Sequence, residues 1–305
     1  MFYRLQLDDI VKEAEKQKCS LSDLIKERES LETGMTIEEI TKTMEEMYQV
    51  MWEDYHSGVE SDNRSISGLT GGEGWRLMNY VKENANHPGG IYIKAAARAM
   101  GVSNTNASMG RIVATPTAGS CGIIPGVLIT LAEEYGKNKD DVVDSLIVAA
   151  YIGKVIAENA SISGAEGGCQ AECGSAAAMA AGAGVHMRGG RPKQVAQAAA
   201  FALKAVMGLI CDPVAGLVES PCIKRNGFGA VQALLAMDMA LAGIESIIPP
   251  DEVIIAMGEV GRTMPVTLKE TSEGGIASTP TGKRIAEYLE NAGSNCLQQF
   301  LIRNQ

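Results

Sequence analysis

Three cysteines in the middle of the chain carry the side chains best suited to metal chemistry. Cys169, Cys211 and Cys222 are 42 and 11 residues apart, and each lies close to a glycine or proline. Thiolates at such breaks suit a soft metal or an iron–sulfur cluster, because a break lets distant sulfurs converge on one point. Three ligands leave one coordination position free, which is typical of a catalytic metal centre. The alternative is that these are small core residues, since free cysteine is among the most buried residue types.

The overall composition narrows the classes of protein. The formal net charge of -10 argues against a nucleic-acid partner, which needs a basic surface. No apolar run reaches about 18 residues, so no membrane span is expected. The seven cysteines are an odd number, and the first residues do not resemble a signal peptide. We therefore expect reduced thiols in a cytoplasmic protein, with some of them binding metal.

The hydrophobic pattern predicts an all-α protein. The chain is 46% hydrophobic with 34 glycines and only 5% aromatic residues, so its core must be built from small and aliphatic side chains. Period-two alternation with β-branched residues is scarce, whereas several long stretches are apolar nearly all round, as in buried helices. The expected helices are 91–100, 127–135, 140–160, 175–187, 192–209, 230–242 and 251–257.

Three segments differ in character. Residues 1–60 are expected to form a charged helical segment that packs on the body or on a partner, residues 61–290 a compact helical catalytic domain, and residues 291–305 a tail. In the first segment, Thr36 and Glu39 form a capping-box pattern. Apolar residues then follow at spacings of three and four, which predicts one packing face of a long helix. They are Ile37, Ile40, Met44, Met47 and Met51.

Two glycine-rich loops, 67–74 and 114–126, open onto helices and are expected to converge on the cysteine site. Neither fits the dinucleotide or the phosphate-loop pattern. Such a loop can bind a carboxylate through backbone N–H groups at a helix start, although its glycines can equally serve as turns and caps. The presence of two such loops together with the cysteine stretch favours a binding site over simple turns and caps.

Other chemistries find less support. The three histidines form no zinc-binding pair. Lys224 could be imagined as a Schiff-base lysine, but Lys224 and Arg225 are better interpreted as anion-binding or surface charges.

Several long motifs resemble one known family. They are Ser67 to Gly72, Ala114 to Ser120, Asn159 to Ala165, Gly168 to Glu172, Cys211 to Asn226 and Thr279 to Gly282. Over nearly its whole length the chain resembles the iron–sulfur-dependent L-serine dehydratases, specifically the α subunit of the two-subunit form. Single-chain members carry a further regulatory domain with a Ser-Ser-Ser-His-Thr segment, which does not occur here. The resemblance therefore implies a separate β subunit and a hetero-oligomer.

The resemblance also implies the cofactor and the reaction. Cys169, Cys211 and Cys222 match the three ligands of a 4Fe-4S cluster, and no pyridoxal phosphate is expected. The substrate is L-serine, converted to pyruvate and ammonia in amino-acid catabolism and gluconeogenesis. The iron without a thiolate can act as a Lewis acid toward the substrate hydroxyl. Cys173, four residues after Cys169, and Cys296 near the end of the chain are the alternatives for a fourth ligand.

The substrate-binding residues are expected on the loops. The first choices for the serine carboxylate are Ser67, Thr70, Gly71 and Gly72, the second choices Thr115, Thr117 and Ser120, and Asn159 and Ser163 could orient the cluster or substrate. The base that removes the α-proton stays open. Lys224 and Glu166 are candidates, and so are Glu172 and a residue of the partner subunit.

Two other functions stay open at this point. One is a hydro-lyase that acts on a different hydroxy acid. The other is a non-enzymatic iron–sulfur sensor or binding protein whose cluster is structural or redox-responsive.

Overall fold

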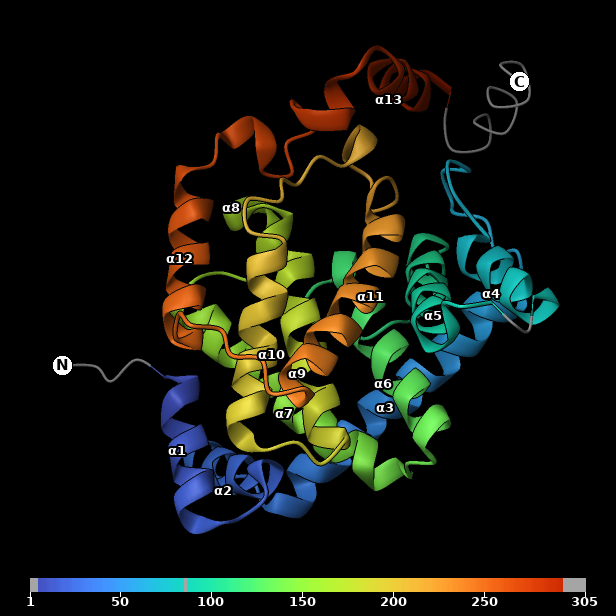
Figure 1. Ribbon diagram of the computed structural model, residues 1–305. Coiled ribbons are helices and arrows are strands. Elements are labelled where there is room, and N and C mark those ends of the chain that lie inside the picture. Colours follow the sequence, from blue (N-terminus) through green and yellow to red (C-terminus); the bar gives the residue numbers. More distant parts are fainter. Residues whose placement is uncertain (1–4, 85–86, 293–305) are drawn as a thin grey trace.

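The computed structural model describes residues 5–84 and 87–292 (Figure 1). Over these residues the chain forms thirteen α-helices and no β-strand, which confirms the all-α prediction. The helices are α1 Leu7–Gln17, α2 Leu21–Thr33, α3 Ile37–Glu60, α4 Glu73–Glu83, α5 Gly90–Ala107, α6 Ile123–Tyr135, α7 Lys139–Asn159, α8 Gly164–Gly167, α9 Ser175–Met187, α10 Pro192–Ala205, α11 Cys222–Leu241, α12 Pro250–Thr263 and α13 Pro280–Ala292.

Helix α9 forms the centre of the fold, and α6, α7, α10 and α11 pack around it (Figure 1). Its alanines and glycines are buried, so the surrounding helices can approach its backbone closely. A Cβ atom on Gly182 would lie 2.3 Å from Cδ1 of Ile152 in α7. A Cβ on Gly184 would lie 2.9 Å from Sδ of Met237 in α11. The low aromatic content is thus explained by a core whose helices meet through small residues.

A second group of helices is built around α5, which packs against α3, α4, α6 and α11. Gly58 of α3 and Gly101 of α5 face each other so closely that a Cβ on Gly58 would lie 2.1 Å from the Gly101 carbonyl oxygen. These contacts fix the loop 61–72 between α3 and α4, which carries the first glycine-rich motif.

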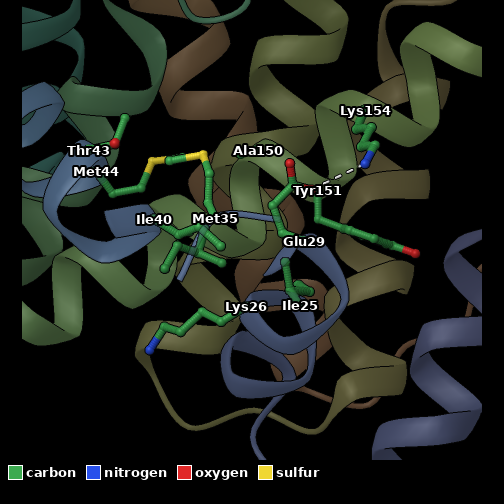
Figure 2. Close-up of a pocket in the computed structure, with 11 residues that line it drawn as sticks. Ile25, Lys26, Glu29, Met35, Ile40, Thr43, Met44, Ala150, Tyr151 and Lys154 are labelled. Atoms are coloured by element: carbon green, nitrogen blue, oxygen red, sulfur yellow. Dashed lines mark hydrogen bonds and ion pairs between the residues drawn. The ribbon is translucent and has the colours of Figure 1, made fainter. Parts of the chain in front are cut away.

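The first helices pack on the body of the protein. Helix α1 contacts α10 and α12, and the Asp251 carboxylate accepts hydrogen bonds from the backbone N–H groups of Leu7 and Asp8 at 2.9 and 3.0 Å. A cavity of about 210 Å³ lies between α2, α3 and α7 and is mostly apolar (Figure 2). At its edge Lys154 forms an ion pair with Glu29 at 3.2 Å. The division of the chain at residues 60 and 290 stays a prediction.

The start of α3 follows the sequence pattern. The Thr36 hydroxyl accepts a hydrogen bond from the Glu39 N–H at 3.2 Å, and the Glu39 carboxylate accepts one from the Thr36 N–H at 2.8 Å, which confirms the capping box. The apolar stripe is only partly in the core. Ile40 and Met51 are buried, whereas Ile37 is 40% exposed and Met47 is 38% exposed.

Candidate metal centre

The three predicted cysteines lie on three different elements. Cys169 follows the short helix α8 and begins the π-helical turn Gln170–Gly174, Cys211 lies in the loop after α10, and Cys222 is the first residue of α11. The beginning of α11 and the short helix α8 both lie toward the upper end of the bundle in Figure 1. The fold therefore brings segments that are distant in sequence to the same end of the molecule.

All three thiols are buried and close enough to interact. Their exposed fractions are 1% for Cys169, 3% for Cys211 and 6% for Cys222. Burial is the main cause that raises the pKa of Cys211, and it raises the pKa of Cys222 to about 12; charge on Cys169 raises both further. Both thiols therefore favour the neutral form, and a metal that binds them as thiolates must displace their protons.

A fourth sulfur lies beside Cys169. The donor atoms of Cys169, Glu172 and Cys173 all lie within 4.8 Å of one another. The Cys173 thiol donates a hydrogen bond to Cys169, which lowers the pKa of Cys169, and the Arg225 charge lowers it further. The Cys173 thiol therefore keeps its proton and shares it with the Cys169 sulfur through this hydrogen bond. This placement keeps Cys173 as an alternative fourth ligand, whereas Cys296 lies outside the described residues.

Glycine is required immediately before Cys169. Gly168 has a φ of 77°, a left-handed conformation that side chains disfavour. A Cβ at this position would also lie 2.7 Å from Sδ of Met264 and 2.8 Å from the Leu209 carbonyl oxygen. Gly168 therefore allows the turn that aims Cys169 into the site.

The loop 114–122 closes over Glu172. The Thr117 hydroxyl donates to the Glu172 carboxylate, and a Cβ on Gly119 would lie 2.5 Å from its Oε1 atom. Burial raises the pKa of Glu172, while the bond from Thr117 lowers it. Thr115 and Ser120 bond within the loop itself, to the carbonyl oxygens of Cys121 and Thr115. This loop thus delivers Thr117 to the site and uses the other two hydroxyls to hold its own shape.

Asn226 joins this loop to the cysteine helix. It is completely buried, and its amide oxygen accepts a hydrogen bond from the Gly122 N–H at 2.9 Å. Its amide nitrogen donates to the carbonyl oxygens of Gly119 at 2.7 Å and Cys222 at 3.0 Å. One side chain therefore positions both the Thr117 loop and the first turn of α11.

The first glycine-rich loop is fixed by a buried glutamate. Glu219 accepts hydrogen bonds from the hydroxyls of Ser67 at 2.8 Å and Thr70 at 2.6 Å. Gly71 donates its N–H to Glu73, and Gly72 has a φ of 69°, a left-handed conformation that side chains disfavour. The loop thus reaches the segment just before Cys222, but both hydroxyls proposed for substrate already have an acceptor.

A partly buried ion pair ties the Cys211 segment to α11. Arg225 lies 2.8 Å from the Asp212 carboxylate and donates to the Ile210 carbonyl oxygen at 3.0 Å. The other carboxylate oxygen of Asp212 accepts from the Ile276 N–H at 2.8 Å. The sequence had suggested only an anion-binding or surface role for Arg225. The structure instead half-buries it where its charge also acts on Cys169 and Cys222.

The remaining predicted residues have other partners. Lys224 forms an ion pair with Glu73 at 2.6 Å, and Glu166 accepts a hydrogen bond from Ser161 at 2.6 Å on an exposed turn. Asn159 donates to the Leu5 and Val155 carbonyl oxygens. The Ser163 carbonyl accepts the N–H groups of the first turn of α8. Their roles in catalysis or binding stay predictions.

One acidic residue at the site was missed by sequence reasoning. The Glu270 N–H donates to the Cys211 carbonyl oxygen at 2.8 Å, and the Cys211 N–H donates to Leu268 at 2.9 Å. Glu270 belongs to none of the motifs in the sequence, and it comes to the site only through this pairing between distant segments.

The donor set fits an iron–sulfur cluster. Three buried thiols come from three different elements. Gly164 leaves space beside one of them, since a Cβ on Gly164 would lie 3.1 Å from Sγ of Cys211. Thiolates are the ligands that such clusters use.

Across residues 5–84 and 87–292, no helix is long and apolar enough to cross a membrane.

The fold and the site define an all-helical protein with a buried three-thiol centre, and comparisons with known proteins specify its family. The sequence model described as serine dehydratase alpha chain matches residues 16–277. A Bacillus subtilis protein described as a probable L-serine dehydratase, alpha chain, is 46% identical over 284 residues, which covers 93% of both chains. The L-serine dehydratase, alpha chain, of Peptoniphilus asaccharolyticus is 41% identical over 277 residues, which covers 91% of this chain and 95% of the relative. The chain belongs to the serine dehydratase alpha chain family.

Longer relatives match as well. The L-serine dehydratase of Helicobacter pylori (strain J99) is 36% identical over 283 residues, which covers 89% of this chain but only 60% of the relative. About two fifths of that protein therefore lies outside the match.

The hydrogen bonds of Asn226 lead to a stability prediction. Replacing Asn226 by alanine leaves one backbone N–H and two carbonyl oxygens without their partner, so unfolding should cost about 3 kcal/mol less. Urea unfolding measures this. The control is Gln232→Ala on the same helix, which loses one partly buried bond to Ala202 and should cost about 1 kcal/mol. Equal stability of the two variants would contradict the role given to Asn226.

Proposed function

We propose that this chain is the α subunit of an iron–sulfur L-serine dehydratase, which converts L-serine to pyruvate and ammonia. The observation that carries the proposal is the meeting of Cys169, Cys211 and Cys222 in one buried site. Membership of the serine dehydratase alpha chain family, and the names of the relatives from Bacillus subtilis and Peptoniphilus asaccharolyticus, support the choice of serine.

The cofactor of this proposal is a 4Fe-4S cluster held by Cys169, Cys211 and Cys222. When bound, it would supply a Lewis-acidic iron for the substrate hydroxyl, which is a poor leaving group without such help. The chain itself provides a site whose walls are fixed. Asn226 and the Arg225–Asp212 ion pair hold the segments that carry the cysteines. Little conformational entropy is therefore lost in bringing the ligands together when the cluster binds.

Proton transfer requires a group beside the thiols, and the geometry favours Glu172. Its carboxylate is buried, lies within 4.8 Å of the Cys169 sulfur and is oriented by Thr117. Lys224 and Glu166 are less favoured because each is engaged elsewhere, with Glu73 and Ser161. In this proposal a Glu172 carboxylate oxygen takes the α-proton of serine and then gives this proton to the departing hydroxyl, which leaves as water. The released aminoacrylate then becomes pyruvate and ammonia by hydrolysis.

We further propose that a β subunit completes the enzyme in the cytoplasm. The relatives of matching length are described as alpha chains, whereas the Helicobacter pylori relative is longer and is not so described. A cleft of about 900 Å³ beside Ser67 and Glu219 is bordered by the exposed side chains of Ile66 and Met109. Exposed apolar groups around a cleft next to the site support a partner on this face.

The proposed activity is tested by assaying pyruvate from L-serine. The chain is loaded anaerobically with iron and sulfide and assayed with and without its β subunit. We expect pyruvate when both subunits are present. A complex with an intact cluster absorbance that forms no pyruvate would remove serine dehydration as the function.

The ligand assignment is tested separately by cysteine variants. Cys169→Ala, Cys211→Ala and Cys222→Ala should each lose the visible absorbance of the cluster, because each removes a thiolate that binds iron. Cys19→Ala serves as the matched control and should keep the absorbance, since Cys19 lies in the turn between α1 and α2. A normal spectrum in the Cys211 variant would show that this residue is not a ligand.

The role of Glu172 is tested by Glu172→Gln, which keeps the size of the side chain and its place beside Thr117. If Glu172 takes the α-proton, kcat should fall by a factor of about 10² to 10⁴ while the cluster absorbance is kept. Glu166→Gln is the matched control and should keep most of the activity. A fully active Glu172→Gln enzyme would assign the base to another residue.

A further inference from the structure

The Glu270 carboxylate lies near the Cys211 sulfur, on a constrained corner of the chain. Its backbone has a φ of 64°, in the left-handed region that residues other than glycine rarely adopt. The Glu270 N–H donates to the Cys211 carbonyl oxygen, and Cys211 pairs with Lys269 as in a parallel β-bridge. The position of Glu270 is therefore set by the same segment that carries Cys211.

The side chain of Glu270 is directed toward the space beside the Cys211 sulfur. A Cβ atom placed on Gly164 would lie 3.3 Å from Oε2 of Glu270, 3.1 Å from Sγ of Cys211 and 3.5 Å from Oε2 of Glu172. One thiol and two carboxylates thus surround the same small space. Glu270 is solvent-exposed, whereas Glu172 is buried, so Glu270 is the carboxylate that an entering molecule meets first.

The acidic side chains around the site differ in whether they have partners. Glu172 accepts a hydrogen bond from Thr117, Glu219 accepts from Ser67 and Thr70, and Asp212 pairs with Arg225. Within residues 5–84 and 87–292, the Glu270 carboxylate has no hydrogen-bond donor or cation of its own. The neighbouring cation Lys269 lines a different cavity, together with Arg262 and Glu166.

An ammonium group is the complement of such a carboxylate. It carries three N–H donors and a positive charge, and hydrogen bonds between charged partners are about twice as strong as neutral ones. We propose that Glu270 binds the ammonium group of the amino-acid substrate and so selects amino acids over hydroxy acids that lack it. This inference rests on the proposed function, because it assigns a part of the serine-binding site.

The test compares two small ligands that each carry only some of the groups of serine. L-alanine has the ammonium and carboxylate but no hydroxyl, and L-glycerate has the hydroxyl and carboxylate but no ammonium. Their dissociation constants are measured by anaerobic equilibrium dialysis with the cluster-loaded two-subunit enzyme. The variant is Glu270→Gln, which removes the charge. The control is Glu273→Gln, which removes an exposed charge from the same loop.

Glu270→Gln should weaken the binding of L-alanine about 10- to 100-fold, the range expected for losing a hydrogen bond between charged groups. The KM for L-serine should rise similarly, the binding of L-glycerate should stay within about twofold, and the iron content should not change. Glu273→Gln should bind all three ligands like the unaltered enzyme.

Other outcomes overturn the inference. Equal weakening of L-alanine and L-glycerate would indicate a general disturbance of the site, and loss of iron would indicate that Glu270 supports the cluster. Unchanged L-alanine binding would remove any role in recognising the ammonium group. The proposed function is tested independently of this inference, and it is wrong if the unaltered enzyme forms no pyruvate from L-serine. If the unaltered enzyme does not bind L-alanine measurably, the KM for L-serine decides, and an unchanged KM in the Glu270→Gln enzyme disproves the ammonium site.

Discussion

Holding three buried thiols from distant segments close enough to interact is the constraint on which the rest of the structure depends. Each sulfur lies on a different element, and burial raises the pKa of two of them. The segments must therefore be fixed by other groups. Asn226 joins the start of α11 to the Thr117 loop, and the Arg225–Asp212 pair joins it to the Cys211 loop. Buried polar contacts of this kind are costly to disrupt, so they define one arrangement of the site.

Close packing through small residues also brings the chain that follows α12 to the thiol site. A Cβ on Gly261 of α12 would lie 2.9 Å from the Cα atom of Gly167 in α8. A Cβ on Gly258, one turn earlier in α12, would lie 3.0 Å from the Cα atom of Ala160. Because α12 packs so tightly on this segment, the chain that follows it reaches Cys211 and pairs with it. The glycines in the sequence thus serve helix approach as much as turns.

The sequence was sufficient for features that depend on local patterns. Apolar helical stretches without β-branched alternation predicted the all-α fold, and the pair Thr36 and Glu39 predicted the start of α3. The structure confirms both predictions. The cysteines stood out because of their type and their flanking breaks. Their convergence agrees with the cluster prediction, while their role as ligands stays a proposal.

Features that depend on tertiary pairing could not be predicted. Ser67 and Thr70 looked free to bind a substrate, but the structure gives both hydroxyls to Glu219, about 150 residues away in sequence. Glu270 carries no local signal, since only the pairing of its segment with Cys211 brings it to the site. Lys224 is the opposite case. It lies near Cys222 in the sequence and was predicted as a candidate base, but its ammonium group forms an ion pair with Glu73. Single-sequence patterns report local preference, whereas hydrogen-bond partners across the fold are set by packing.

The central claim is that three thiolates hold a 4Fe-4S cluster and leave one iron for the substrate. Mössbauer spectroscopy of the two-subunit enzyme loaded with iron-57 tests it most directly. The account predicts that adding L-serine shifts the signal of roughly a quarter of the cluster iron and leaves the rest unchanged. A cluster whose spectrum is identical with and without L-serine, in an enzyme that forms pyruvate, would contradict it.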